Sequence, residues 1–346
     1  MVHALVRSMP ESVRADMRVW LPDSDRHPRY PLCRRIEDLG VEVAHVRLPV
    51  LRRQQMSPSG LARLSGAVRS LRGDIRDLGP DQLILGTSAL LPAVGACPQG
   101  TRLVLYQQEI WTGPQRRILG TLARRANLII ANSGATRDSL PAPLHDRVVL
   151  VPNCTEDPGP DAAPPAGSDE HLTFLMGGRW APRKGHEQLL TAWDDAGCPG
   201  RLIVAGGPPP LGSAVDVACL VADSARPETV VLAGELPHLA GLLPQVDVVV
   251  VPSLEPESFG LTAVEAFAWS RPVIAAATGG LSEVVVAGTG WLHTPGDTQE
   301  LSRLLSERRP DEVRAAGVRA RQRYLKLYTP DTYRLGIRQA LGFTQG

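Results

Sequence analysis

Two carboxylates, Glu257 and Glu265, flank the start of a predicted helix. That helix follows a buried β-branched strand, Val248–Val251, and a polar loop, and it begins near Gly260. Its first amides have no partner within the helix and lie at the positive end of the dipole, so they suit a phosphate. Ionised carboxylates beside a phosphate site suit hydroxyl groups, from which they accept hydrogen bonds. The pattern therefore predicts a ligand that joins phosphate to hydroxyl-bearing rings, as a nucleotide sugar does.

Each glutamate alone has an ordinary explanation, because Glu257 would also suit a solvated loop and Glu265 a helix surface. A second group of residues upstream favours the binding interpretation. It follows the first strand of the second half and contains Gly178, Arg179 and Lys184. The glycine lets a ligand approach the backbone, while the two cations offer a planar fork and a point charge to phosphate oxygens. The spacing differs from that of a Walker phosphate loop.

Strands and helices alternate along the chain, as a parallel sheet with helical crossovers requires. Strands are expected over 17–22, 41–46, 81–86, 102–106, 128–131, 148–151, 172–176, 201–205, 230–233, 246–251, 272–275 and 290–292. Helices are expected over 32–39, 61–78, 115–126, 185–195, 214–224 and 332–341, and after Gly260. Residues 1–16 show no clear element, although 4–7 could form a short strand.

A change of composition divides the chain of 346 residues, which is long enough for two domains. Residues 157–170 are rich in Pro, Ala, Gly and Asp without apolar periodicity and are predicted to be a linker. It would separate an N-terminal domain, 1–156, from a C-terminal domain, 171–330. The expected fold is α/β, with two Rossmann-like, doubly wound domains facing each other across a cleft.

Composition argues against several classes of function. A net charge of +1 gives no general basic field for nucleic acid. No apolar run reaches the ~18 residues of a membrane helix, and the basic helix 115–126 predicts peripheral lipid contact at most, a solvated face being the simpler explanation. The five cysteines show no C-x-x-C spacing and indicate free thiols in a reducing cytoplasm. The histidines show no metal-ligand spacing.

Together the motifs resemble those of retaining glycosyltransferases of family 4, which have the GT-B fold. The resemblance covers residues 174–285 well and rests on Gly178-Arg179 through Lys184-Gly185, on Glu257 and Glu265 with Phe259-Gly260 between them, and on Thr278–Glu283. In the first half it rests on Asn132-Ser133 and Val151–Asn153. It implies a hexosyltransferase that moves a sugar from a nucleotide-diphosphate sugar to an acceptor hydroxyl, and the wealth of Arg, Ala, Pro and Gly independently suggests a bacterial genome. UDP, GDP, ADP and TDP remain equal candidates, and no cofactor is implied.

The resemblance also implies a role for each matching residue. Glu257, Arg179 and Lys184 would form the catalytic set, with Glu257 near the reacting carbon and the two cations on the diphosphate. Glu265 would bind the ribose. The full donor site would comprise Gly178, Ser258, Phe259, Gly260, Leu261, Thr262, Glu265, Glu235 and Leu236. The acceptor would attack from the face that the diphosphate leaves, and the cations and helix dipole would replace a metal ion. The last helix, in 331–346, would return to the first domain.

Two departures from the family pattern concern the acceptor side. The loop 22–30 lacks the Gly-Gly of many relatives, so Arg26, His27 or Arg29 could take its place. After the strand 102–106, Gln108 and Glu109 stand where many relatives have a histidine. These two residues could bind sugar or acceptor, or could cap a polar loop. The acceptor-side candidates are therefore Gln108, Glu109 and His27.

Several alternatives remain. Asp23-Ser24-Asp25 matches the D-x-D motif of metal-dependent transferases, but the rest of that pattern is missing. A GT-B-like sugar-nucleotide epimerase would share the architecture but needs acid and base groups at the sugar. A sugar-nucleotide-binding subunit without activity is disfavoured by the retained glutamates and cations. The acceptor is expected to be a soluble small molecule or secondary metabolite rather than a lipid-linked one or a polysaccharide. His186, beside Lys184, is expected at a helix surface.

Overall fold

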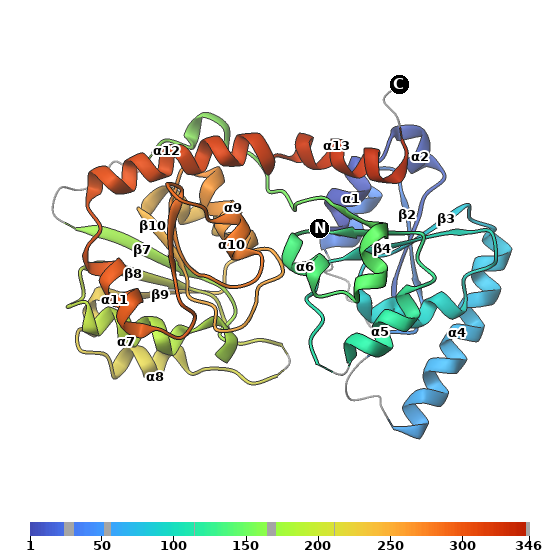
Figure 1. Cartoon of the computed structure of the whole chain (residues 1–346), viewed down its shortest axis with the longest axis horizontal. Coiled ribbons are helices and arrows are strands. Elements are labelled where there is room, and N and C mark those ends of the chain that lie inside the picture. The colour runs from blue at the N-terminus through green and yellow to red at the C-terminus, as the bar shows by residue number, and fades with distance from the viewer. Residues whose placement is uncertain (24–30, 52–56, 114, 165–170, 211, 344–346) are drawn as a thin grey trace. The chain divides into compact units, whose positions relative to one another are not determined.

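The computed structural model describes residues 1–23, 31–51, 57–113, 115–164, 171–210 and 212–343. By their contacts the residues divide into two units: unit 1 comprises Met1–Pro152 with Tyr333–Gly346, and unit 2 comprises Asn153–Thr332 (Figure 1). Among the described residues, no helix combines the length and the apolarity that crossing a bilayer takes.

The described strands of unit 1 all pair in parallel, as one group of two (β1-β2) and one of four (β3-β4-β5-β6). Their bounds are β1 (Arg18–Pro22), β2 (Glu42–Val46), β3 (Gln82–Leu85), β4 (Arg102–Gln107), β5 (Leu128–Ala131) and β6 (Val148–Leu150). The helices are α1 (Val2–Ser8), α2 (Glu11–Ala15), α3 (Pro31–Glu37), α4 (Pro58–Leu78), the 3₁₀ helix η3 (Ser88–Gly95), α5 (Gln115–Ala123), α6 (Gly134–Asp138) and α13 (Pro330–Leu341).

The N-terminal residues differ from the expectation, because they form α1 and α2 instead of the short strand suggested for 4–7. Leu5 and Val6 are buried in α1, and Val6 belongs to a core with Val19 and Ile36. Packing of this one apolar face decides in favour of a helix, although four residues are too few to show a helical period.

The final helix, α13, packs within unit 1. The Tyr333 hydroxyl lies 2.7 Å from that of Tyr106, which is buried on β4. Arg102 donates to the Leu341 carbonyl at 2.7 Å, and Arg338 donates to the Ser8 carbonyl at 2.8 Å. The helix is therefore tied to β4 and to α1.

Unit 2 has a parallel sheet of six described strands in the order β12-β11-β10-β7-β8-β9. Their bounds are β7 (Leu172–Gly177), β8 (Gly200–Ala205), β9 (Val230–Gly234), β10 (Val248–Val251), β11 (Val273–Ala276) and β12 (Gly290–His293). The chain enters at β7, moves outward to β9, and then returns to place β10 on the other side of β7. The gap between the loops after β7 and β10 is thus the topological switch point, where open α/β sheets bind ligands.

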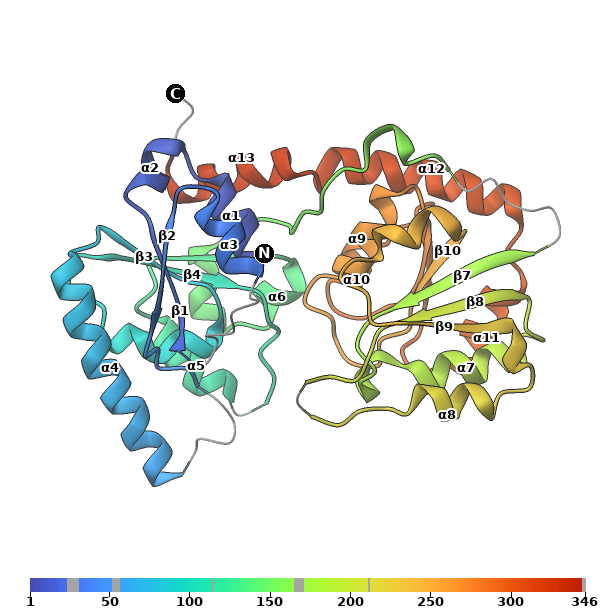
Figure 2. The same cartoon turned by 180° about the vertical axis from the view of Figure 1, so that it is seen from behind.

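Helices cover both faces of this sheet, with α9 and α10 on one and α7, α8 and α11 on the other (Figures 1 and 2). Their bounds are α7 (His186–Asp195), α8 (Val217–Ala222), α9 (Leu261–Ala268), α10 (Leu281–Val284), α11 (Thr298–Ser306) and α12 (Pro310–Leu327). Phe267 and Tyr324 lie in the core that includes α9 and α12, and Phe174 and Trp193 lie in the opposite core. Each core is therefore a layer between sheet and helices.

The described part of the segment expected to be a linker, 157–164, packs on unit 2. Arg321 contacts Asp157 at 2.6 Å, and Arg271 donates to the Ala163 carbonyl at 2.7 Å. The Ser270 hydroxyl donates to the Ala162 carbonyl. The segment lacks apolar periodicity because its backbone and one carboxylate make these contacts, so it belongs to unit 2 instead of forming a free linker.

Candidate functional site

The loops after β7 and β10 touch beside the switch point. Gly185 has φ +75° and lies so close to the β10 loop that a Cβ would be 2.1 Å from the Pro252 carbonyl oxygen. The amide of Leu254 donates to the carbonyl of Arg183 at 2.9 Å. Glycine is the residue that permits both this backbone angle and this approach. Lys184 is thereby fixed next to the polar loop that precedes α9.

Lys184 and Glu257 form an ion pair across these loops. The Lys184 Nζ lies 2.5 Å from Glu257 Oε1, to which Ser253 Oγ also donates at 2.8 Å. Arg183 lies farther away, at 3.6 Å. Burial acts to raise the pKa of Glu257, but the charge and hydrogen bond of Lys184, with Ser253 and Arg183, hold that pKa below its usual value. Glu257 is therefore a carboxylate at neutral pH, and no described residue donates to its Oε2.

A cavity of about 230 Å³ lies at the same edge of the sheet. Two of its charged side chains, Arg179 from the β7 loop and Glu265 from α9, make no hydrogen bond or ion pair with any described residue. Burial raises the pKa of Glu265 to about 7. The cavity is lined by Gly177, Gly178, Arg179, Ala205, Gly206, Gly207, Glu235, Leu236, Pro237, His238, Leu239, Thr262 and Glu265. It thus offers a cation and a carboxyl group to one ligand.

The first backbone amides of α9 have no acceptor among the described residues, as the sequence predicts. Gly260 has φ +98°, and a Cβ there would be 2.5 Å from Leu281. The amides of Ala263 and Val264 donate to the Gly260 carbonyl. No described group accepts from the amides of Leu261 and Thr262, so both remain available to an anion.

The structure places the predicted donor residues in three positions. Gly178, Arg179, Glu235, Leu236, Thr262 and Glu265 line the cavity. Lys184 and Glu257 form the adjoining ion pair, and Gly260 and Leu261 form the helix start next to Ser258. Phe259 is buried against Tyr328, with ring centroids 5.8 Å apart. The Phe259 side chain therefore packs in the core of unit 2 and anchors the loop before α9.

Gln108 and Glu109 follow β4 in unit 1. Glu109 accepts hydrogen bonds from the hydroxyls of Thr87 and Ser88, at 2.6 and 2.7 Å, and from the Ser88 amide. It therefore caps the start of η3, one of the two explanations that the sequence left open. Gln108 accepts from Asn132 at 3.3 Å. His27, with Arg26, Arg29, Ser24 and Asp25, lies outside the described residues.

His186 is not at the surface, as the sequence had suggested, but is 1% exposed. Neither ring nitrogen has a partner among the described residues, and burial, assisted by Lys184, lowers its pKa to about 4. Its helix, α7, turns this first residue inward together with Leu189 and Leu190. A polar residue at a helix start is usually solvated, so the sequence alone predicted an exposed side chain for His186.

Two contributions to the site were missed from the sequence. Gly206 and Gly207 line the cavity after β8, and a Cβ on Gly206 would lie 1.9 Å from the Gly178 carbonyl oxygen. The glycine pair directly after a strand was a readable signal for this close approach. Ser253, which holds Glu257, carried no such signal because it acts only through the fold of its loop.

We expect Glu265→Gln to stabilise the protein without ligand at alkaline pH. The pKa of about 7 in the folded state exceeds the ordinary glutamate pKa of 4.5, so the folded state holds a proton that the unfolded state releases. Stability is therefore lost as pH rises from about 4.5 to 7, and the substitution should restore about 1–3 kcal/mol at pH 8 but much less at pH 5. Urea unfolding at both pH values measures this. Glu187→Gln, at an exposed position of α7, is the matched control, and an equal effect of Glu265→Gln at both pH values would contradict the prediction.

Comparison with known proteins finds a family model and several relatives that resemble this chain. Residues 171–307 match the family model described as Glycosyl transferases group 1. The D-inositol 3-phosphate glycosyltransferase of Mycolicibacterium smegmatis is 29% identical over 260 residues, 69% of this chain and 56% of the relative. The protein of that name from Mycobacterium avium is 37% identical over 188 residues, 49% of this chain and 43% of the relative. The chain thus spans about half the length of these relatives.

A solved structure extends the likeness to nearly the whole chain. HepE of Anabaena, crystallised in complex with UDP and glucose, superposes with a TM-score of 0.77 at 20% identity. The match covers 99% of this chain and 96% of HepE, which shows a shared fold.

Proposed function

We propose that the protein is a glycosyltransferase with the GT-B fold, because residues 171–307 match the family model described as Glycosyl transferases group 1 and nearly the whole chain shares the fold of HepE. Its donor would be a nucleotide-diphosphate sugar. The observation that carries the proposal is the cavity that brings Arg179 and Glu265 together near the Lys184–Glu257 pair, although neither makes a hydrogen bond or ion pair with any described residue. A phosphate-bearing and hydroxyl-bearing ligand would satisfy both cavity groups.

The donor would lie along the carboxyl edge of the unit 2 sheet. Its ribose hydroxyls would donate to Glu265, and its base would meet the loop that contains Glu235 and Leu236. The diphosphate would bind to Arg179, to Lys184 and to the amides at the start of α9. Lys184, held by Glu257, and the amides of α9 are in place before the ligand arrives, which is the condition for stabilising a leaving group.

Glu257 would contact the sugar through Oε2, the oxygen that Lys184 and Ser253 do not use. The acceptor hydroxyl would attack the anomeric carbon from the face that the diphosphate leaves, and a diphosphate oxygen would take its proton. This route retains the anomeric configuration. It is metal-independent in our proposal, because fixed cations and amides meet the leaving charge. Among the described residues, no group of three or more His, Cys, Asp or Glu is placed to hold a metal ion.

The acceptor is proposed to be a small polar molecule. The relatives are named for D-inositol 3-phosphate, so a phosphorylated cyclitol is the first acceptor to test. UDP is the first donor nucleotide to test, because HepE was crystallised with UDP. The five cysteines are free thiols, which favours a cytoplasmic place for the reaction.

A thermal-shift screen with UDP, GDP, ADP and TDP tests the donor class. A nucleotide at about 100 times its Kd adds about 2.7 kcal/mol to the stability of the folded state, so the correct one should raise Tm. We expect the same shift with Mg²⁺ and with chelator. A shift that needs Mg²⁺ would overturn metal independence, and the absence of any shift would overturn the nucleotide site.

A further inference from the structure

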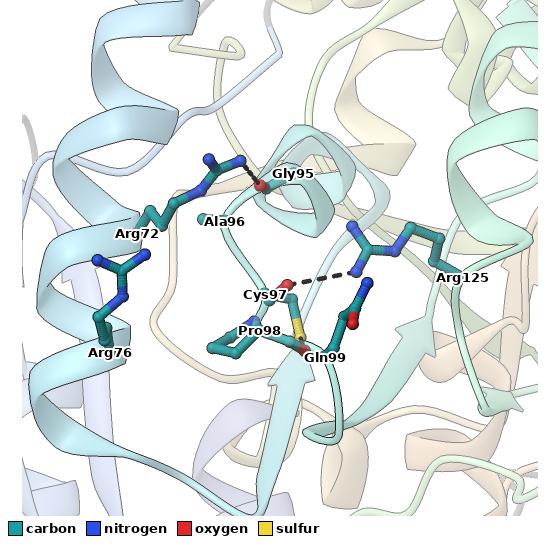
Figure 3. A pocket seen from close by; sticks show the side chains of 8 residues that line it. All are labelled: Arg72, Arg76, Gly95, Ala96, Cys97, Pro98, Gln99 and Arg125. Carbon is teal, nitrogen blue, oxygen red and sulfur yellow. Dashed lines mark hydrogen bonds between the residues drawn. The ribbon is translucent and has the colours of Figure 1, made fainter.

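Unit 1 contains a cavity of about 340 Å³ that the proposed reaction does not use (Figure 3). It lies beside residues 95–99, which precede β4, whereas the proposed acceptor residues Gln108 and Glu109 follow β4. The six residues of a strand extend about 20 Å, so the cavity belongs to the opposite, amino-terminal edge of the same sheet.

Three arginines surround this cavity. Arg72 and Arg76 extend from α4, and Arg125 lies on the other side of the segment 95–99 (Figure 3). None of the described residues that line it is acidic. Cys97 adds no negative charge, because burial raises the pKa of its thiol. The lining therefore carries an uncompensated positive charge.

Two of the guanidinium groups are held in place by backbone carbonyls. Arg72 donates to the Gly95 carbonyl at 2.6 Å. Arg125 donates to the Val94 carbonyl at 2.8 Å and to the Cys97 carbonyl at 3.3 Å. A guanidinium has five N–H groups, so both arginines keep donors for a ligand. These contacts fix the forks before any ligand binds, which reduces the entropy lost on binding.

Arg76 differs from the other two because it makes no hydrogen bond or ion pair with any described residue. It lies one helical turn after Arg72, so both face the cavity from the same side of α4. Two carbonyl-bound forks can be explained by the fold alone. A third guanidinium beside them, with no hydrogen bond or ion pair to a described residue and no acidic residue in the described lining, is not explained in that way.

We propose that this cavity binds a phosphate group, held by Arg72, Arg76 and Arg125. Guanidinium forks match phosphate oxygens in pairs, and the three positive charges exceed the two negative charges of a phosphate dianion. The phosphate would belong either to a soluble phosphorylated compound or to a phospholipid headgroup, since the same atoms are recognised in both. The site is separate from the donor cavity and does not depend on the proposed transferase activity.

Titration of the full chain with inorganic phosphate by calorimetry tests the site. Arg76→Ala should weaken phosphate binding about tenfold or more, the usual effect of losing a charge-assisted hydrogen bond. Arg76 is the residue to change because its side chain makes no hydrogen bond or ion pair with any described residue. Arg63→Ala is the matched control, since it removes the same charge from the same helix outside the cavity.

Lys184→Ala separates this site from the proposed donor site in unit 2. Phosphate binding that survives Lys184→Ala and Arg63→Ala but is weakened by Arg76→Ala supports the proposal. Binding that is lost in Lys184→Ala and unchanged in Arg76→Ala would overturn it, because the phosphate would then occupy only the donor site.

Sedimentation with vesicles identifies the source of the phosphate. Vesicles of phosphatidylcholine alone are compared with vesicles that also contain phosphatidic acid, whose headgroup is a phosphomonoester. Arg76-dependent binding to the second vesicles assigns a lipid headgroup, and Arg76-dependent binding of inorganic phosphate without vesicle binding assigns a soluble compound. If neither depends on Arg76, the proposal is wrong.

Discussion

Lys184→Ala is expected to weaken binding of the donor nucleotide by about 2–4 kcal/mol, as befits the loss of charge-assisted hydrogen bonds to a diphosphate. The same change removes the cation 2.5 Å from Glu257, whose side chain is only 16% exposed. Turnover should therefore fall by about 100-fold or more, because both the leaving group and the carboxylate lose their positive partner. Calorimetry with the nucleoside diphosphate and steady-state kinetics with the nucleotide sugar measure the two effects.

Arg183→Ala is the control for the loss of one positive charge near Glu257. Arg183 directly precedes Lys184 in the chain. One of its guanidinium nitrogens lies 3.6 Å from Glu257 Oε1, and its side chain is 35% exposed. Screened pairs of this kind contribute about 0–1 kcal/mol, so this variant should bind nearly as well as the wild type. Equal affinity of Lys184→Ala and the wild type would remove Lys184 from the diphosphate site.

Glu257→Gln should lower kcat by about 100-fold while changing the Kd of the nucleoside diphosphate by less than about threefold. Glutamine keeps the size of the side chain but loses the negative charge. That charge would accept hydrogen bonds from the sugar and stabilise positive charge at the reacting carbon. The nucleoside diphosphate has no sugar, so its binding should be spared.

Ser253→Ala provides a graded comparison, because it removes one neutral hydrogen bond to the same Glu257 oxygen and leaves the carboxylate in place. Its kcat should fall by much less than that of Glu257→Gln. If Glu257→Gln reduced nucleotide binding and turnover by the same factor, Glu257 would not be a sugar contact.

Local patterns in the sequence were sufficient to predict the parallel α/β architecture and the two loops that form the site. The apolar run Val248–Val251 and the glycine at 260 are local signals, and the structure has β10 and the α9 start there. The pairing of Lys184 with Glu257 had no local signal, because it depends on β10 lying next to β7 in register. Sequence reasoning assigned both residues to the ligand without predicting their contact.

The differences between expectation and structure have a common physical cause. His186 is polar but faces inward, and the segment 157–164 is irregular but packs on unit 2. In both cases the course of the backbone, and not the residue type, decides which groups these residues contact. Hydrogen bonds made by Arg271 and Ser270 with carbonyls of the irregular segment leave no periodic trace in the sequence.

The strand order of unit 2 also determines when the site can form during folding. The ion pair joins residues 73 positions apart and exists only after β10 has inserted beside β7. Closing a loop of this size costs entropy that grows with the logarithm of its length, and such non-local contacts slow folding. A chain that has folded only through β9 therefore has Lys184 without Glu257, its partner in the ion pair. The ion pair therefore requires that the centre of the sheet, where β10 lies beside β7, is complete.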